Sequence, residues 1–214
     1  MDKIELNKIV PHVFSVKENL VSEVWDNEIE LEKGRSYLIE AASGTGKSSL
    51  CSFIYGYRKD YEGKISFDDA DIKSFTNAGW TEIRQKHIGI MFQEFRLFPE
   101  LTAGENVIIK NNLTGFRSME QIKSWFSMLG IEGKWNEPVG KMSFGQQQRV
   151  AFIRMLCQPS DFLLMDEPVS HLDDGNGKIM GDILAKEIKD RGVGVIVTSI
   201  GRRLNMNYDT EIKL

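Results

Sequence analysis

The sequence predicts an α/β fold with a mainly parallel sheet, and two features of the 214-residue chain support this class. Strand-like and helix-like segments alternate at both ends of the chain, as they do in strand–helix–strand units. Several strand-like segments are apolar throughout, which is typical of strands buried in the middle of a parallel sheet. A helix-rich stretch from about 95 to 157 predicts a helical subdomain inserted in a single domain that spans 1–214.

The expected strands are short segments bounded by polar or glycine-containing residues. They cover residues 4–6, 25–32, 36–40, 64–67, 88–92, 162–165 and 193–198. The expected helices show apolar residues at helical spacing, and they cover 46–55, 103–111, 119–129, 144–157 and 177–189. Some begin with an S/T-x-x-E/Q capping box, in which side chains satisfy N–H groups of the first turn: Thr102 with Glu105, Ser118 with Gln121, and Ser143 with Gln146.

Composition and charge narrow the class of protein. The chain carries 27 Lys and Arg against 31 Asp and Glu, a net charge of −4, and its basic residues are scattered. Because proteins that bind nucleic acid gather basic residues into a patch, nucleic acid is not expected as a partner. No apolar leader and no apolar run of about 18 residues occur, so a cytoplasmic chain without its own membrane span is expected. Cys51 and Cys157 lack a paired or metal-ligand spacing and are expected to be buried, reduced thiols.

A glycine-containing segment follows the strand expected at 36–40 and precedes the first expected helix. It reads Ala41-Ala42-Ser43-Gly44-Thr45-Gly46-Lys47-Ser48-Ser49, which indicates a phosphate-binding P-loop over residues 43–49. Glycines let the backbone wrap so that successive N–H groups point at phosphate oxygens, and the helix N-terminus adds its positive end. Lys47 is then expected to reach the β- and γ-phosphates, and the Ser48 hydroxyl to bind Mg²⁺.

The first position of the P-loop departs from the strict pattern G-x-x-x-x-G-K-[ST], because Ala41 stands there. If the backbone needs a positive φ at this position, alanine costs on the order of 1 to 2 kcal/mol. A glycine-rich turn with an exposed lysine is the alternative interpretation. The strand–loop–helix context favours the P-loop.

The apolar strand expected at 162–165 ends abruptly in Asp166 and Glu167. Ligands of α/β folds bind at the carboxyl edge of the parallel sheet, so these acids are expected beside the P-loop. Asp166 is predicted to hold Mg²⁺, usually through water, and Glu167 to accept a proton from the attacking water. Two solvated acids at a strand end are the alternative, which the P-loop in the same chain makes the weaker one.

The segment Met142-Ser143-Phe144-Gly145-Gln146-Gln147-Gln148-Arg149-Val150-Ala151 resembles the LSGGQQQRVA signature of ABC ATPases. The resemblance covers nearly the whole chain, including the P-loop, Gln93 as the Q-loop residue, the acids Asp166 and Glu167, and 170–173 as the D-loop. The segment 97–107 looks most like the ATPase subunits of lipoprotein-releasing and macrolide-export transporters. This resemblance implies a RecA-like P-loop NTPase core, with an N-terminal antiparallel β part and an inserted helical subdomain.

The resemblance also implies ligands and a dimer. ATP and Mg²⁺ would be bound, and Gln93 would lie near the metal and the attacking water. Ser143, Gly145 and Gln146 of one chain would close over ATP held by a second copy, in a two-fold symmetric homodimer. Ser143 has physical grounds for this role, since it caps a helix whose N-terminus can meet an anion.

A membrane partner is implied as well. A separate permease would span the membrane and hold the chain at the inner face of the cell membrane. The apolar residues Phe95, Leu97 and Phe98 would help to form a groove for a short helix of the permease, and ordinary packing within the helical insert is the alternative. The cargo and its direction belong to that partner and cannot be read from this chain.

Several positions depart from the family pattern. Phe144 replaces a glycine of the signature, where it either narrows the approach to phosphate or packs beneath the helix. Ser199 stands where the family has a histidine that reaches the γ-phosphate, and no histidine follows His171, which is itself expected at an interface or as a cap. Phe14 is the best candidate for stacking on adenine, with core packing as the alternative.

Two interpretations of function therefore remain. Long coiled-coil segments, which an ABC ATPase of DNA repair or chromosome organisation needs, do not fit in the roughly fifty residues between Gln93 and Ser143. The favoured interpretation is the ATP-binding and ATP-hydrolysing subunit of a transporter. The alternative is a slow-turnover, ATP-dependent clamp or regulator, which the departures at Ala41, Phe144 and Ser199 keep open.

Overall fold

Five parallel strands form the main sheet of the structure, a computed structural model that describes residues 1–14 and 22–214. The strands stand in the order β6–β7–β8–β3–β9, and each neighbouring pair is parallel. Every residue of β7 and β8 is buried, which confirms the predicted α/β class with its mainly parallel sheet. The bounds are Ser36–Glu40 (β3), Ile88–Met91 (β6), Phe162–Asp166 (β7), Gly194–Ser199 (β8) and Thr210–Lys213 (β9).

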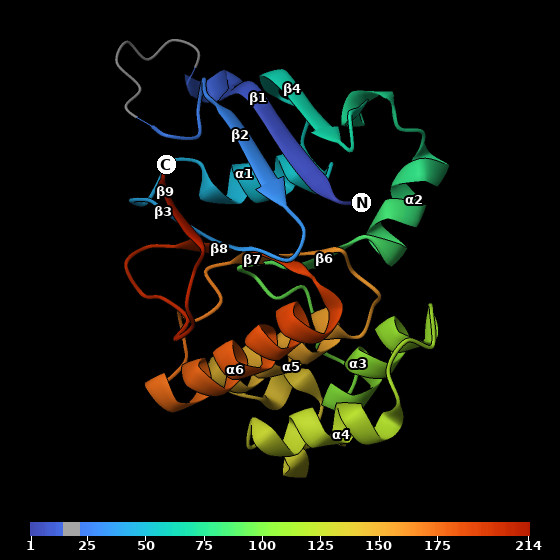
Figure 1. Cartoon of the computed structure of the whole chain (residues 1–214). Helices are drawn as coiled ribbons and strands as arrows, with labels where there is room; N and C mark the ends of the chain where they lie inside the picture. The colour runs from blue at the N-terminus through green and yellow to red at the C-terminus, as the bar shows by residue number, and fades with distance from the viewer. Residues whose placement is uncertain (15–21) are drawn as a thin grey trace.

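An antiparallel sheet lies on one side of the parallel sheet, at the top of Figure 1, in the order β2–β1–β4–β5. Helix α1 (Lys47–Ile54) lies between the two sheets, and its buried side chains share one apolar cluster with residues of β1, β3 and β4. The antiparallel β part implied by the resemblance is therefore present. Its strands are Lys3–Pro11 (β1), Glu28–Glu32 (β2), Tyr61–Phe67 (β4) and Ala70–Asp71 (β5).

The other face of the parallel sheet is covered by α5 (Phe144–Leu156) and α6 (Asp174–Arg191), with α3 (Ala103–Asn112) and α4 (Met119–Met128) farther out (Figure 1). Helix α2 (Asn77–Lys86) lies beside β6. The stretch 95–157 holds α3, α4 and α5 and shares one apolar cluster with α6, β7 and β8. Its separation as an inserted subdomain stays a prediction. Short 3₁₀ helices occupy His12–Phe14, Ile72–Ser74, Glu132–Lys134 and Val139–Lys141.

The prediction that a strand begins at Trp25 is wrong. Residues 24–27 form a turn in which Asp26 has a φ of 59°, and β2 begins only at Glu28. The Asp26 N–H donates to the Ile9 carbonyl of β1 (3.1 Å). Aspartate tolerates this left-handed conformation better than most residues, so a turn forms where the aromatic and β-branched side chains suggest a strand.

The predicted helix caps are mostly correct. The capping boxes of Thr102 and Ser143 are complete. The box predicted at Ser118 is only half formed, because the Gln121 side chain accepts a hydrogen bond from Arg117 (3.5 Å) rather than from the Ser118 N–H. Helix α6 begins earlier than expected, at Asp174, because the Asp173 carboxylate accepts a bond from the Asn176 N–H (2.8 Å).

Both cysteines are buried and free, as expected. Burial raises the pKa of the Cys157 thiol to about 12 and raises the pKa of the Cys51 thiol, so neither forms a thiolate near neutral pH. Within the described residues, no helix is both long enough and apolar enough to cross a membrane.

Candidate nucleotide-binding site

The carboxyl ends of three neighbouring strands bring most of the predicted site residues together. Strand β3 leads into the phosphate loop (41–49), β7 ends in Asp166, and β8 ends in Ser199. Because β8 lies between β3 and β7, with Glu40 opposite Ser199 and Asp166 opposite Thr198, these ends share one edge of the sheet. This carboxyl edge is where α/β folds bind ligands.

The phosphate loop offers a run of backbone donors. In the described part of the chain, none of the backbone N–H groups from Ala42 to Ser49 has a protein acceptor. Gly44 and Gly46 have φ values of 80° and 101°, in a region that residues with a side chain adopt rarely. Gly46 also caps α1. A run of free N–H groups that ends in a helix N-terminus is a ready anion-binding arrangement.

Ala41 does not strain the loop. Its φ is not positive, and its N–H donates to the Ser199 carbonyl (3.1 Å), which continues the pairing of β3 with β8. The cost considered for an alanine at a positive φ therefore does not arise. The missing glycine leaves the backbone of the loop intact.

Lys47 lies inside the loop and is only 4% exposed. Its Nζ donates to the carbonyls of Ala42 (2.9 Å) and Ala41 (3.4 Å), and it lies 3.7 Å from Glu167 Oε1. The structure thus brings together the predicted lysine and the predicted general base. The ammonium is thus bonded to carbonyls of the same loop whose N–H groups are free within the described residues, and phosphate oxygens could join its coordination.

The two acids at the end of β7 have separate surroundings. Asp166 is buried and accepts a hydrogen bond from the Thr198 hydroxyl (2.6 Å). Glu167 has a φ of 52°, and its N–H donates to the Thr198 carbonyl (3.1 Å). This left-handed backbone costs about 1 to 2 kcal/mol in a residue with a side chain. It ends β7 and turns Glu167 toward Lys47 and toward Gln93, whose Nε2 lies 3.5 Å from Glu167 Oε2.

The signature residues Ser143, Gly145 and Gln146 lie at the N-terminus of α5. Ser143 caps α5, its hydroxyl accepts a bond from the Gln146 N–H (3.3 Å), and Gln146 Oε1 accepts one from the Ser143 N–H (3.0 Å). Within the described residues, no hydrogen bond or ion pair joins Ser143, Gly145 or Gln146 to 41–49. They stand as a second candidate anion site on the same molecule, at the N-terminus of a helix.

Phe144 does not pack beneath the signature helix. Its side chain is 65% exposed and stacks on the ring of His171, with 5.3 Å between centroids and 23° between planes. His171 Nδ1 lies 2.9 Å from Ser170 Oγ. The backbone of His171 also approaches Gly145 closely, since a Cβ on that glycine would lie 2.8 Å from the His171 carbonyl oxygen. The aromatic pair therefore stands exposed beside the signature.

Two predicted site residues lie beside the loop, but their side chains are buried rather than open to a ligand. Ser199 is buried. Its hydroxyl donates a hydrogen bond to the carbonyl of Arg202 and not to Glu167. Phe14 is 8% exposed and belongs to the apolar cluster between the sheets, with its ring centroid 6.3 Å from that of Trp25. This burial favours the core-packing alternative, since adenine stacking needs an accessible ring face.

Two residues that are not among the predicted site residues contact the acids. One is Thr198, the partner of Asp166. The other is Gln148, a fully buried residue of α5 whose Nε2 lies 3.5 Å from the Glu167 carbonyl and whose Oε1 accepts a bond from the His171 N–H (3.3 Å). The signal that marks Gln148 is a polar residue within an otherwise apolar helix face, because buried amides need partners.

The fold and the site define the class of protein as a P-loop nucleotide-binding protein. The ABC transporter family matches residues 25–170, most of the chain, and the chain belongs to this family. It is 30% identical over 195 residues to the ABC transporter ATP-binding protein YtrE of Bacillus subtilis, covering 88% of this chain and 84% of that protein. It is 28% identical over 214 residues to the lipoprotein-releasing system ATP-binding protein LolD of Roseobacter denitrificans, covering 99% and 94%.

Solved structures agree with this membership. The dimeric structure of MJ0796, a bacterial ABC transporter cassette, has a TM-score of 0.78 at 28% identity and covers 92% of this chain and 87% of that one. A post-hydrolysis dimer of MJ0796 bound to ADP and Pi has a TM-score of 0.77 at the same identity.

The substitution Lys47→Ala tests the site. A charge-assisted hydrogen bond is worth about 1.5 to 3 kcal/mol, so we expect ATP binding to weaken by at least about tenfold in a nucleotide titration. Lys86→Ala is the matched control, because Lys86 is an exposed lysine of α2 that pairs only with Glu82. Equal ATP affinity in wild type and Lys47→Ala would contradict the assignment of this loop to nucleotide binding.

Proposed function

We propose that the chain is the ATP-binding and ATP-hydrolysing subunit of an ABC transporter, which drives a separate membrane permease through ATP-dependent dimerisation. The observation that carries this proposal is the run of N–H groups from Ala42 to Ser49, which have no acceptor in the described part of the chain, together with the buried Lys47. The names of YtrE and LolD, both ATP-binding proteins, support it.

The phosphates of ATP would bind the loop residues Ser43, Gly44, Thr45, Gly46, Lys47, Ser48 and Ser49. Mg²⁺ fits the oxygen atoms at the carboxyl edge, namely the Asp166 carboxylate, the Ser48 hydroxyl and the Gln93 amide oxygen. A magnesium ion that is bound with nucleotide phosphates needs only one or two protein ligands. The Thr198 hydroxyl, which donates to Asp166 Oδ1, orients the carboxylate and leaves its second oxygen for the metal or its water.

Hydrolysis would begin with Glu167 as the general base. Water attacks the γ-phosphorus, the bond between that phosphorus and the bridging oxygen of ADP breaks, and the proton of the water passes to Glu167. Lys47 would stabilise the charge that develops on the phosphate oxygens. Gln93, 3.5 Å from the Glu167 carboxylate, is placed to orient the water.

Dimerisation would complete the site. Ser143, Gly145 and Gln146 of one chain would close over ATP on the phosphate loop of a second copy. The dimeric structures of MJ0796 support this arrangement, and within the described residues no hydrogen bond or ion pair already joins the signature residues to 41–49. Two-fold symmetry then places two ATP molecules between two chains.

The substitution Glu167→Gln tests hydrolysis and dimerisation together. Loss of a general base slows the chemical step by about 10² or more, while the amide keeps the shape of the side chain and leaves ATP binding intact. We expect phosphate release to fall accordingly and a nucleotide-bound dimer to accumulate in size-exclusion chromatography with Mg-ATP. Wild-type phosphate release, or a monomer at high concentration, would contradict the role of Glu167.

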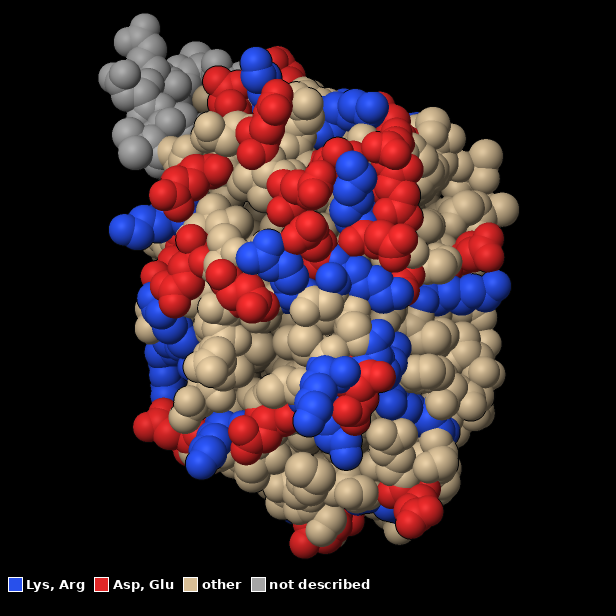
Figure 2. Space-filling view, in the orientation of Figure 1, with Lys and Arg blue, Asp and Glu red and all other residues tan. Residues whose placement is uncertain are grey.

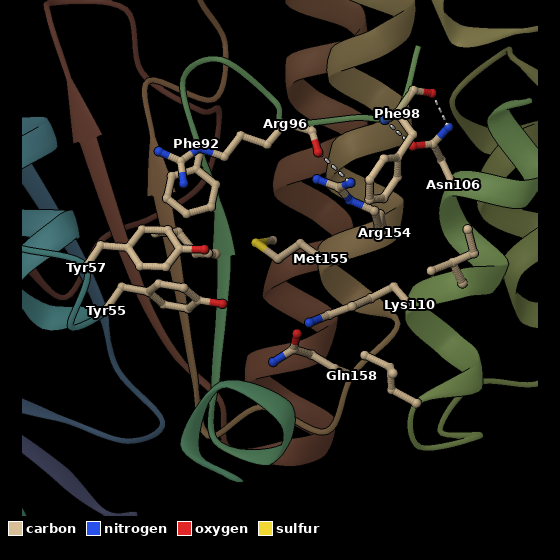
Figure 3. Close-up of a pocket in the computed structure, with 13 residues that line it drawn as sticks. Tyr55, Tyr57, Phe92, Arg96, Phe98, Asn106, Lys110, Arg154, Met155 and Gln158 are labelled. Atoms are coloured by element: carbon tan, nitrogen blue, oxygen red, sulfur yellow. Dashed lines mark hydrogen bonds between the residues drawn. The ribbon is translucent and has the colours of Figure 1, made fainter. Parts of the chain in front are cut away.

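The groove after Gln93 is the proposed docking site of the permease. It is a cavity of about 230 Å³ lined by residues from the turn after α1, from β6 and the segment that follows it, from α3 and from α5, and Figure 3 shows its main side chains. Phe98 is 51% exposed, whereas Phe95 is buried and Leu97 packs against the core. Of the three apolar residues predicted for this surface, only Phe98 lines it. The lining residues are Tyr55, Tyr57, Ile90, Phe92, Arg96, Phe98, Asn106, Ile109, Lys110, Leu113, Arg154, Met155 and Gln158.

The charge of the groove indicates what the permease segment carries. Its ionised lining residues are Arg96, Lys110 and Arg154, without an aspartate or glutamate. Arg154 already donates to the carbonyls of Phe95 (2.7 Å) and Arg96 (2.8 Å). Lys110 points into the groove (Figure 3), and partial desolvation followed by repulsion from Arg154 lowers its pKa. A carboxylate beside apolar side chains would suit this surface, because it would offset the positive charge of the three lining cations.

The substitution Phe98→Ala tests the groove. Removal of an exposed aromatic anchor from the centre of an interface costs about 2 kcal/mol or more, so recovery of the chain with permease-containing membranes should fall about thirtyfold. Binding of ATP in solution should stay unchanged. Met119→Ala is the control, since Met119 is similarly exposed but lies outside the groove. Equal recovery of the two variants would place the permease contact elsewhere.

One observation favours the slow-turnover clamp as a second candidate function. The Ser199 hydroxyl is engaged with the Arg202 carbonyl, so no side chain at this position supplies a donor to the γ-phosphate. Loss of one such donor costs roughly 2.7 to 4 kcal/mol, about 10² to 10³ in rate. Under this candidate, ATP binding and closure of the dimer are the main output, and basal hydrolysis is weak.

The substitution Ser199→His distinguishes the two candidates. An imidazole that reaches the γ-phosphate should raise the turnover number at least tenfold and leave nucleotide affinity nearly unchanged. The measurement is steady-state phosphate release, with and without the permease. Brisk hydrolysis by the wild type, with no gain in Ser199→His, would dismiss the clamp and leave the transport ATPase standing.

A further inference from the structure

The turn before β2 packs a tryptophan against the phosphate loop. Trp25 is 2% exposed, and its backbone N–H donates to Ser22 Oγ (2.9 Å). The neighbouring Asp26 N–H donates to the Ile9 carbonyl of β1 (3.1 Å). The turn is therefore fixed both by its own residues and by the antiparallel sheet, and the indole has little freedom to move.

The indole contacts the loop at Thr45 and Gly46. Trp25 Nε1 donates to the Thr45 carbonyl at 3.0 Å. A Cβ placed on Gly46 would lie 2.9 Å from Trp25 Cζ2 and 3.0 Å from the ring of Phe14. The two aromatic rings thus pack directly against this part of the loop, and only glycine fits at position 46.

The direction of one carbonyl fixes the direction of the next N–H. The Thr45 carbonyl and the Gly46 N–H belong to the same peptide unit, which is planar and trans, so the two groups point in opposite directions. Because the carbonyl is directed at the indole, the Gly46 N–H is directed away from it. That N–H has no acceptor within the described residues.

We propose that Trp25 is a positioning residue for phosphate binding: its indole N–H holds the Thr45–Gly46 peptide so that the Gly46 N–H faces the phosphates. This inference rests on the proposed function of the loop. The bond is needed because Gly46 has a φ of 101° and Gly44 one of 80°, and glycines leave such a peptide free to rotate. A rotated peptide would present the Thr45 carbonyl to the phosphates and repel them.

The alternative role for Trp25 is to fill space beneath the loop. Trp25→Phe separates the two roles, because phenylalanine keeps an aromatic ring but removes the N–H. Trp80→Phe is the matched control: Trp80 is equally buried, and its Nε1 has no hydrogen-bond partner among the described residues. Binding of ADP and of inorganic pyrophosphate is measured by calorimetry for wild type and both variants, together with thermal unfolding.

We expect Trp25→Phe to weaken ADP and pyrophosphate about equally, by about five- to tenfold, the effect of one lost hydrogen bond. Trp80→Phe should bind both ligands as the wild type does. Wild-type affinities in both variants would overturn the positioning role and leave the proposed function standing. If the wild type binds neither ADP nor pyrophosphate, the proposed function itself is contradicted.

If Trp25→Phe does not fold, a second measurement tests the positioning role of Trp25. The indole N–H signals of the 4 tryptophans are recorded by NMR in the wild type, and the Trp25 signal is assigned by elimination from Trp→Phe variants of the other three. Pyrophosphate should shift the Trp25 signal more than that of Trp80. An unmoved Trp25 signal at saturating pyrophosphate would overturn the inference.

Discussion

The structure depends on a set of backbone N–H groups in the phosphate loop that have no acceptor among the described residues. Free N–H groups from Ala42 to Ser49 carry a cost wherever they are shielded from water, and an unconstrained loop would fold back to satisfy them. The fold prevents this. Helix α1 is enclosed between two sheets, Ala41 is tied to β8 through the Ser199 carbonyl, and Trp25 holds the Thr45 carbonyl from the opposite side. Three separate elements therefore contact the loop and hold its backbone.

The charges of the site follow from the same constraint. A buried ammonium needs hydrogen-bond partners, and the partners of Lys47 are two loop carbonyls, with the Glu167 carboxylate at 3.7 Å. The carbonyls are neutral acceptors, so charged phosphate oxygens can replace them with a gain in free energy. Glu167 is held beside Lys47 by a strained left-handed backbone, and strain of this kind persists only where the surrounding structure enforces it.

The elements that the sequence predicts correctly are those whose own residues show a recognisable pattern. The strands β7 and β8 are apolar up to the polar residues at their carboxyl ends. The glycines of the phosphate loop likewise indicate a backbone that turns tightly. The residues of helix α2 show no such apolar pattern, because Trp80 is its only buried side chain. The orientation of Ser199 depends on a carbonyl in the irregular segment that follows β8. The contact of Trp25 with Thr45 joins a turn and a loop that only the folded chain brings together, so no sequence pattern marks either.

Helix α5 connects the two candidate anion sites of one molecule. Its N-terminus carries Ser143, and farther along the same helix Gln148 lies against the Glu167 carbonyl and the His171 N–H. The exposed ring of Phe144 also stacks on His171. A helix is stiff over this length because each backbone hydrogen bond links successive turns. Under the proposed function, a nucleotide of the second copy that pulls on Ser143 would also displace the backbone that orients Glu167. Dimer closure and the geometry of the general base are thereby joined through one helix.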